Sequence, residues 1–313
     1  MADRDDEHVR REFHRLLLGN LAVEISEAMT AAGVTAILLK GPVTARLLYD
    51  DPRLRRYADI DLLICPAEEE RASAVLQRLG YSSPLANASP LERSSHGTEY
   101  VSDKAEVDLH RRLPGVGADP ETAWRVLAAG TEPLDLDSGV VTVLAPPAQA
   151  LHVALNAANM GNGERAAEEL GLAMRRLPQA LWQDAAELAV GLDCENAVLA
   201  GFDLVPGGLA FARRLGLQGE IPVGSAVRAR ASTIAVVRLE DFASRRGVRA
   251  KVAFATRELV PTPAFLKANS SLAGRGWPGL ALAYVLRPFE VGRRLGPAAR
   301  EWFSLRRAHR PRG

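Results

Sequence analysis

The sequence predicts an α+β protein: a small sheet with flanking helices over residues 1–145, followed by an α-helical domain over residues 146–313. Short apolar runs bounded by glycine, proline or charged residues occur in the first half, and such runs are typical of buried strands. After residue 145, apolar residues recur at spacings of three and four, as they do in helices. The pair Pro146-Pro147 indicates a boundary between these patterns, because consecutive prolines interrupt regular structure.

The composition excludes several classes of protein. Hydrophobic residues make up 47% and charged residues 25% of the 313 residues, which is typical of a folded globular chain. The net charge is +1, so no overall charge attracts the chain to nucleic acid or to a membrane surface. Only two cysteines occur and no CxxC motif is present, which disfavours a zinc site or a disulfide framework. No apolar run reaches the roughly 18 residues of a membrane span, so we expect a cytoplasmic protein that does not enter a membrane.

The first elements follow from apolar spacing. Residues 6–32 are expected to form an amphipathic helix, and Gly33 is suited to end it. Residues 35–40 form a short apolar run that predicts a buried strand, and residues 43–49 predict a short helix after it. The apolar residues that define the long helix are Val9, Phe13, Leu16, Leu17, Leu21, Ile25 and Met29.

Two further strand regions complete the first half. Residues 59–65 predict a strand, after which Pro66 begins a helix that Gly80 ends. Residues 96–102 and 105–113 predict a hairpin around a Ser-Asp-Lys turn. The second half predicts helices only, at roughly 148–160, 164–176, 178–192, 208–216, 225–245, 248–260 and 279–309.

Asp59 and Asp61 are the most informative residues of the first half. They are separated by one residue on an expected strand, so their side chains share one face. Two neighbouring anions repel each other unless a cation lies between them. The alternative is a strand edge at which both acids face water.

A third acid and a glycine turn favour the metal interpretation. Asp108 lies in another expected strand with the same apolar–acid–apolar order, and three carboxylates could hold one or two Mg²⁺ ions for phosphoryl chemistry. Lys40-Gly41 ends a strand directly before a short helix, where glycine allows the backbone to approach a phosphate. By itself, Gly41 is better explained as an ordinary strand-to-helix turn.

Together these parts resemble the nucleotidyltransferase fold of the DNA polymerase β superfamily, whose pattern is a glycine-bearing turn, a DxD strand and a later third acid. The chain is more closely similar to one bacterial branch, a family of uncharacterised nucleotidyltransferases. This resemblance implies a polymerase β-like core with a small mixed sheet, followed by a helical domain. The matching segments are Leu39-Lys40-Gly41, the short helix ending at Tyr49, the loop arginine Arg55, Asp59-Ile60-Asp61-Leu62-Leu63 and Asp108-Leu109-His110.

The resemblance implies roles for individual residues. Asp59, Asp61 and Asp108 would be the catalytic, metal-binding acids, with Mg²⁺ or Mn²⁺ as the cofactor. Lys40, Gly41, Arg55 and His110 would bind the nucleotide. One departure is Gly41-Pro42, which stands where the superfamily usually has Gly-Ser, so the serine that would contact a terminal phosphate is missing.

The expected reaction is transfer of a nucleoside monophosphate from ATP or another NTP to an acceptor, with release of pyrophosphate. Two alternatives stay open: a DxD-type glycosyltransferase that uses a sugar nucleotide, and a non-catalytic nucleotide-binding or antitoxin-like protein.

The sequence does not identify the acceptor, which could be a small molecule, a peptide, a protein or RNA. The stretch from Arg287 onward is rich in arginine and could meet an acidic partner, although a solvated helix face is the favoured interpretation. His152 and Asn156 share one face of an expected helix and could line a cleft between the two halves, although packing is the favoured interpretation.

Overall fold

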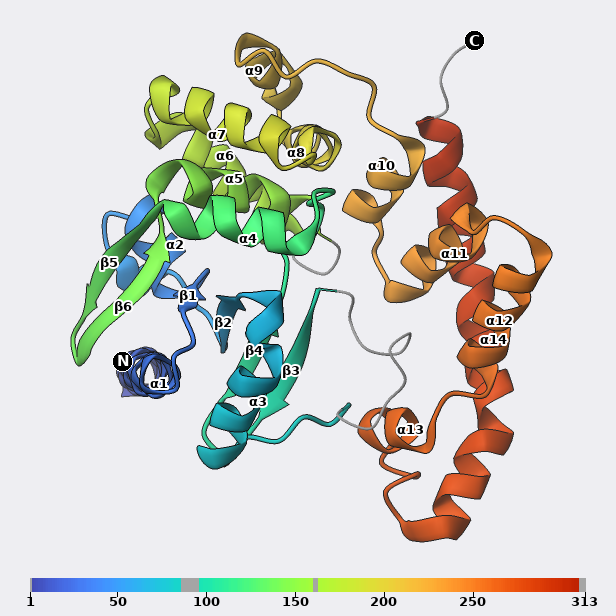
Figure 1. Ribbon diagram of the computed structural model, residues 1–313. Coiled ribbons are helices and arrows are strands. Elements are labelled where there is room, and N and C mark those ends of the chain that lie inside the picture. The colour runs from blue at the N-terminus through green and yellow to red at the C-terminus, as the bar shows by residue number, and fades with distance from the viewer. Residues whose placement is uncertain (1, 86–95, 160–162, 310–313) are drawn as a thin grey trace. The chain divides into compact units, whose positions relative to one another are not determined.

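The computed structural model describes residues 2–85, 96–159 and 163–309, and the chain forms two compact units (Figure 1). The sequence predicts a boundary between two domains at residue 145, and this boundary stays a prediction. The first unit consists of Met1–Ser83, His96–Val153 and Leu172–Asp193; the second consists of Pro84–Ser95, Ala154–Gly171 and Cys194–Gly313.

The first unit contains a six-stranded mixed sheet among the described residues, in the order β3-β4-β2-β1-β6-β5. The pairs β2–β4 and β1–β6 are parallel, and the other neighbours are antiparallel. The predicted α+β class is therefore confirmed. The strands are β1 (Ala36–Leu38), β2 (Asp59–Ile64), β3 (Gly97–Val101), β4 (Glu106–His110), β5 (Thr131–Leu136) and β6 (Gly139–Leu144).

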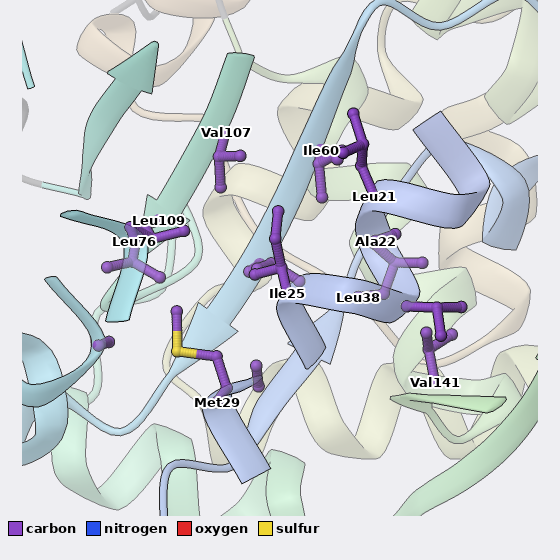
Figure 2. Packing of buried hydrophobic residues seen from close by; sticks show 14 of the residues in the cluster. Leu21, Ala22, Ile25, Met29, Leu38, Ile60, Leu76, Val107, Leu109 and Val141 are labelled. Atoms are coloured by element: carbon purple, nitrogen blue, oxygen red, sulfur yellow. The ribbon is translucent and has the colours of Figure 1, made fainter. Parts of the chain in front are cut away.

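Helices α1 (Ala2–Ala31) and α3 (Glu69–Arg78) pack against one face of this sheet. Figure 2 shows Leu21, Ile25 and Met29 of α1 among residues from β1, β2, β4, β6 and α3. The predicted amphipathic helix is confirmed over this part. The helix continues to Ala2, but the expected burial of its apolar face is wrong nearer the N-terminus, where Phe13 and Leu16 are exposed. The side chain of Val9 lies outside the described residues.

Proline and glycine delimit several short helices of the first unit. Pro42, Pro66 and Pro120 each stand at the first turn of a helix, where a missing N–H costs nothing. These helices are α2 (Pro42–Leu48), η1 (Pro52–Leu54), η2 (Pro66–Glu68), α4 (Pro120–Ala129) and α7 (Gln179–Gly191), while α5 (Pro146–Ala157) and α6 (Gly163–Arg176) contribute residues to both units.

The second unit is helical in its described residues. The single helix expected over 225–245 is wrong, because α10 ends at Arg230 and α11 begins at Ile234. Glu301 accepts hydrogen bonds from the backbone N–H and the hydroxyl of Ser232, at 2.7 Å and 2.5 Å, and so satisfies polar groups at this break. The helices are α8 (Glu195–Phe202), α9 (Gly208–Arg214), α10 (Val223–Arg230), α11 (Ile234–Ser244), α12 (Val248–Leu259), α13 (Pro263–Asn269) and α14 (Gly276–Ala308).

A buried glutamate joins two of these helices. Glu240 of α11 accepts hydrogen bonds from the Trp302 indole at 2.8 Å and from Arg306 at 3.0 Å. Both donors lie on α14, so part of the arginine-rich C-terminal stretch is bound within the unit. In the part of the chain that the structure describes, no helix combines the length and the hydrophobicity that crossing a membrane requires.

Candidate active site

Strand β2 separates an apolar face from an acidic one. Ile60, Leu62 and Ile64 alternate into the core beneath α1. Asp59 and Asp61 therefore lie on the opposite face, as the sequence predicts. Asp61 is the more deeply placed of the two, since only 2% of its surface is exposed.

Strand pairing places further acids beside Asp61. The parallel register between β2 and β4 aligns Asp61 with Asp108 and Leu63 with His110. On the far side of β4, the antiparallel register aligns Glu99 of β3 with Asp108. Directly paired residues share a face, so Asp61, Asp108 and Glu99 form a row across three strands. Glu99 is absent from the predicted site; its place in the strand expected over 96–102 was the available signal.

Lys40 joins Asp61 because β1 and β2 remain paired beyond the regular ladder, where the Leu39 N–H donates to the Asp61 carbonyl at 3.0 Å. The Lys40 Nζ lies 2.7 Å from Asp61 Oδ1, and His110 Nε2 lies 2.9 Å from the same oxygen. Burial alone would raise the pKa of Asp61. The hydrogen bond from His110 and the charge of Lys40 outweigh that effect and hold the pKa well below its usual range. An ionised carboxylate only accepts hydrogen bonds, so His110 Nε2 carries a proton.

The second oxygen of Asp61 is the exceptional atom of this site. Asp61 Oδ2 and His110 Nδ1 are buried and have no hydrogen-bond partner among the described residues. A buried polar atom without a partner is costly, and a cation would relieve that cost. Asp61, Asp108 and His110 each offer one ligand atom, and these atoms all lie within 4.8 Å of one another. The two carboxylates suit Mg²⁺ or Mn²⁺.

The pKa values of the two acids beside Asp61 are raised, as expected for buried carboxylates that lie close together. Burial raises the pKa of Asp59, and the charge of Asp61 raises it further. Burial also raises the pKa of Asp108, with Asp61 and Asp59 adding to the effect against His110, which lowers it. Asp59 lies on the same face as Asp61 but is not part of the group of three ligand atoms.

The glycine turn is fixed by an aromatic ring and an arginine. Gly41 has φ +60° and ψ −116°, and a Cβ there would lie 3.1 Å from a ring carbon of Tyr57. Arg55 is 8% exposed and donates a hydrogen bond to the Gly41 carbonyl at 3.3 Å. Pro42 has no N–H, and the Val43 N–H is bonded to the Lys40 carbonyl, so neither amide is available to a phosphate. The predicted nucleotide-binding roles of Gly41 and Arg55 stay predictions.

His152 of α5 lies near the charged groups, a position that the sequence pattern offered only as the less favoured alternative to packing. It is 5% exposed, and burial lowers its pKa to about 3, with the positive charge of Lys40 adding to the shift. Its ring also hydrogen-bonds the backbone of Leu39. The helical pattern correctly favoured packing for His152, but only the tertiary structure brings α5 close to β1.

Comparisons with known proteins agree with the predicted family. The family described as "Uncharacterised nucleotidyltransferase" matches residues 7–206. No curated protein is similar enough in sequence to count as a relative.

Two solved structures show weak similarity. The solution structure of the antibiotic-resistance factor ANT(2'')-Ia has 17% identity and a TM-score of 0.37, covering 58% of this chain and 94% of that one. The crystal structure of an antigenic nucleotidyltransferase-like protein from Paracoccidioides brasiliensis has 15% identity and a TM-score of 0.33, covering 59% of this chain and 91% of that one. Scores this low carry no argument about the details of this chain.

Proposed function

Because the chain belongs to the family described as uncharacterised nucleotidyltransferase, we propose that it transfers a nucleoside monophosphate from ATP or another NTP to an acceptor, with release of pyrophosphate and with a divalent cation bound. The predicted enzyme class is confirmed by this membership. The cation, the choice of nucleotide and the acceptor belong to the proposal.

One observation carries the proposal of a metal-dependent reaction: the buried, unpartnered Oδ2 of Asp61 beside the carboxylate of Asp108. Asp61 and Asp108 would hold Mg²⁺ or Mn²⁺. His110 would offer a ring nitrogen as a further metal ligand, and Asp59 would be the third acid of the site. A bound cation would neutralise negative charge on the phosphates and on the attacking oxygen. The three acids carry more negative charge than Lys40 offsets, which also favours a bound cation.

The remaining residues have separable roles in the proposed reaction. An acceptor hydroxyl forms a bond to the α-phosphorus, and the bond from that phosphorus to the bridging oxygen breaks, so pyrophosphate leaves. Asp108 would take the hydroxyl proton, a role suited to a carboxylate whose pKa is raised by burial. Lys40 would hold the triphosphate, since it supplies a positive charge beside a turn in which neither Pro42 nor Val43 offers a free N–H.

The two alternatives now differ in support. Family membership favours nucleotidyl transfer over glycosyl transfer. A non-catalytic nucleotide-binding protein would use the same acids and cation, so only a test of transfer separates it from the enzyme.

The first test measures binding of a non-hydrolysable ATP analogue by calorimetry, with Mn²⁺ or with EDTA. We expect binding with Mn²⁺ only, because acids of this site repel a triphosphate without a cation. Asp61→Asn and Asp108→Asn should each weaken Mn²⁺-dependent binding by about tenfold or more, since each removes a charged ligand. Asp103→Asn is the matched control, because Asp103 is an exposed acid at the turn between β3 and β4.

The second test measures transfer itself, by incubating the protein with α-³²P-labelled NTPs and cell extract and identifying labelled products by mass spectrometry. Equal analogue affinity in Mn²⁺ and EDTA would contradict the metal-dependent proposal. Mn²⁺-dependent binding without labelled product in any extract would instead favour the non-catalytic alternative.

A further inference from the structure

Two adjoining cavities lie within the second unit, among α11, α12, α13 and α14. One has a volume of about 110 Å³ and the other of about 640 Å³. Several lining residues are common to both, so the two cavities adjoin, and we call them the small end and the large end of one site. The shared residues are Arg238, Phe254, Glu258, Phe265 and Arg287.

The small end is strongly positive. Four arginines line it against one acid, Glu258, which leaves an excess of positive charge. Arg238 and Arg287 contact Glu258, the first through its carboxylate at 3.4 Å and the second through its backbone carbonyl at 3.1 Å. Arg257 forms no ion pair with any residue that the structure describes. The charge of this end is therefore suited to an anion.

Arg245 gives an independent indication of a bound anion. Its Nε is buried and has no hydrogen-bond partner within the described ranges. Its guanidinium lies 4.5 Å from the centroid of the Phe254 ring, so the ring covers one face of the group. A buried N–H without an acceptor is destabilising, so a small shift of the Arg245 side chain towards an anionic head group at the small end would relieve this cost.

The large end is mainly apolar. Its volume falls in the range of small-molecule sites. Arg294 stands at this end as well and forms no ion pair with the described residues, whereas Glu290 lies 3.9 Å from Arg287. The apolar walls are formed by Ile234, Leu239, Phe242, Leu259, Val291 and Leu295.

We propose that this site binds a small amphipathic acid, with its apolar body in the large end and its carboxylate or phosphate among the arginines of the small end. The proposal rests on charge complementarity and on the unsatisfied Nε of Arg245, not on the sheet carboxylates. Binding measured in EDTA without nucleotide therefore tests it separately from the proposed transfer reaction.

The experiment is calorimetry with ten-carbon probes below their critical micelle concentrations. Decanoate and decyl phosphate distinguish the two head groups, and binding of either supports the site. Decanol should bind at least about tenfold more weakly, because a charged hydrogen bond contributes roughly this much affinity. Decyltrimethylammonium should not bind, because its positive charge is repelled by the arginines of the small end.

Variants of the full-length chain locate the binding. Arg245→Gln should weaken binding of the acids about tenfold and leave decanol unaffected. Ala255→Phe should weaken binding of all probes by narrowing the large end, whereas Val252→Phe on the same helix should not, since Val252 is 57% exposed and lines neither cavity. Circular dichroism confirms that each variant is folded. Absence of acid binding, equal affinity for decanol and decanoate, or wild-type binding by folded Ala255→Phe would each overturn the proposal.

Discussion

The stability of the first unit should depend on pH through His152. The buried imidazole is neutral, because burial and the charge of Lys40 lower its pKa from 6.5 to about 3. In the unfolded chain the imidazole of His152 takes up a proton below pH 6.5, whereas in the folded chain it stays neutral until the pH nears 3. The stabilisation is therefore complete above pH 6.5 and is lost progressively as the pH falls toward 3.

The magnitude follows from these two values. Between pH 7 and pH 5, the difference in proton binding should lower the free energy of unfolding by about 2 kcal/mol. The raised pKa values of Asp59 and Asp108 act in the opposite direction, because those groups hold protons more tightly in the folded state. Both acids are present in wild type and variant, so the difference between the two proteins isolates His152.

The assay is urea unfolding at pH 7 and at pH 5, followed by circular dichroism. His152→Gln cannot titrate but can still donate a hydrogen bond to the backbone of Leu39, so its stability should fall by about 2 kcal/mol less than that of wild type over this interval. His14→Gln, at an exposed position on α1, is the control and should behave as wild type. If His152→Gln lost as much stability as wild type between the two pH values, the buried neutral imidazole would not be the cause.

Two further substitutions test the glycine turn of the candidate site and the buried glutamate of the second unit. Gly41→Ala should destabilise the chain to urea by about 1–3 kcal/mol, because its φ of +60° is strained for alanine and a Cβ would crowd the ring on the turn. Gly191→Ala, where a Cβ meets nothing within 4 Å, should show no such loss. Glu240→Gln should lower the urea midpoint by an amount equivalent to about 1–3 kcal/mol, since it weakens buried hydrogen bonds from Trp302 and Arg306. An unchanged midpoint would show that the buried charge contributes nothing.

The sequence predicted elements well where local pattern and burial agree. The strands around 35–40 and 59–65 and the hairpin around residue 103 are confirmed, since apolar alternation and turn residues both marked them. The strands Thr131–Leu136 and Gly139–Leu144 were missed. Pro133 argues against a strand, but β5 is at the edge of the sheet, where a missing N–H is tolerated.

Site geometry was less accessible from sequence. The shared face of Asp59 and Asp61 followed from strand alternation alone. The contacts of Asp61 with Lys40 and His110 depend on strand order and register, which pairing across the whole sheet determines. His152 reaches the site through helix packing on the sheet, for which a single sequence carries no local signal.

The order of strands in the sheet has a consequence for biosynthesis. All residues of the candidate site except His152 lie within the first 110 positions, on or beside β1, β2 and β4. The partner of β1 on its other side, β6, is made later and joins it only after a long loop closes. Until the β5–β6 hairpin arrives, β1 is an open edge, and open edges invite pairing with other chains. The hairpin therefore covers β1, the strand that leads into Lys40, at a late stage of synthesis. Its short connecting turn allows it to form rapidly once both strands have left the ribosome.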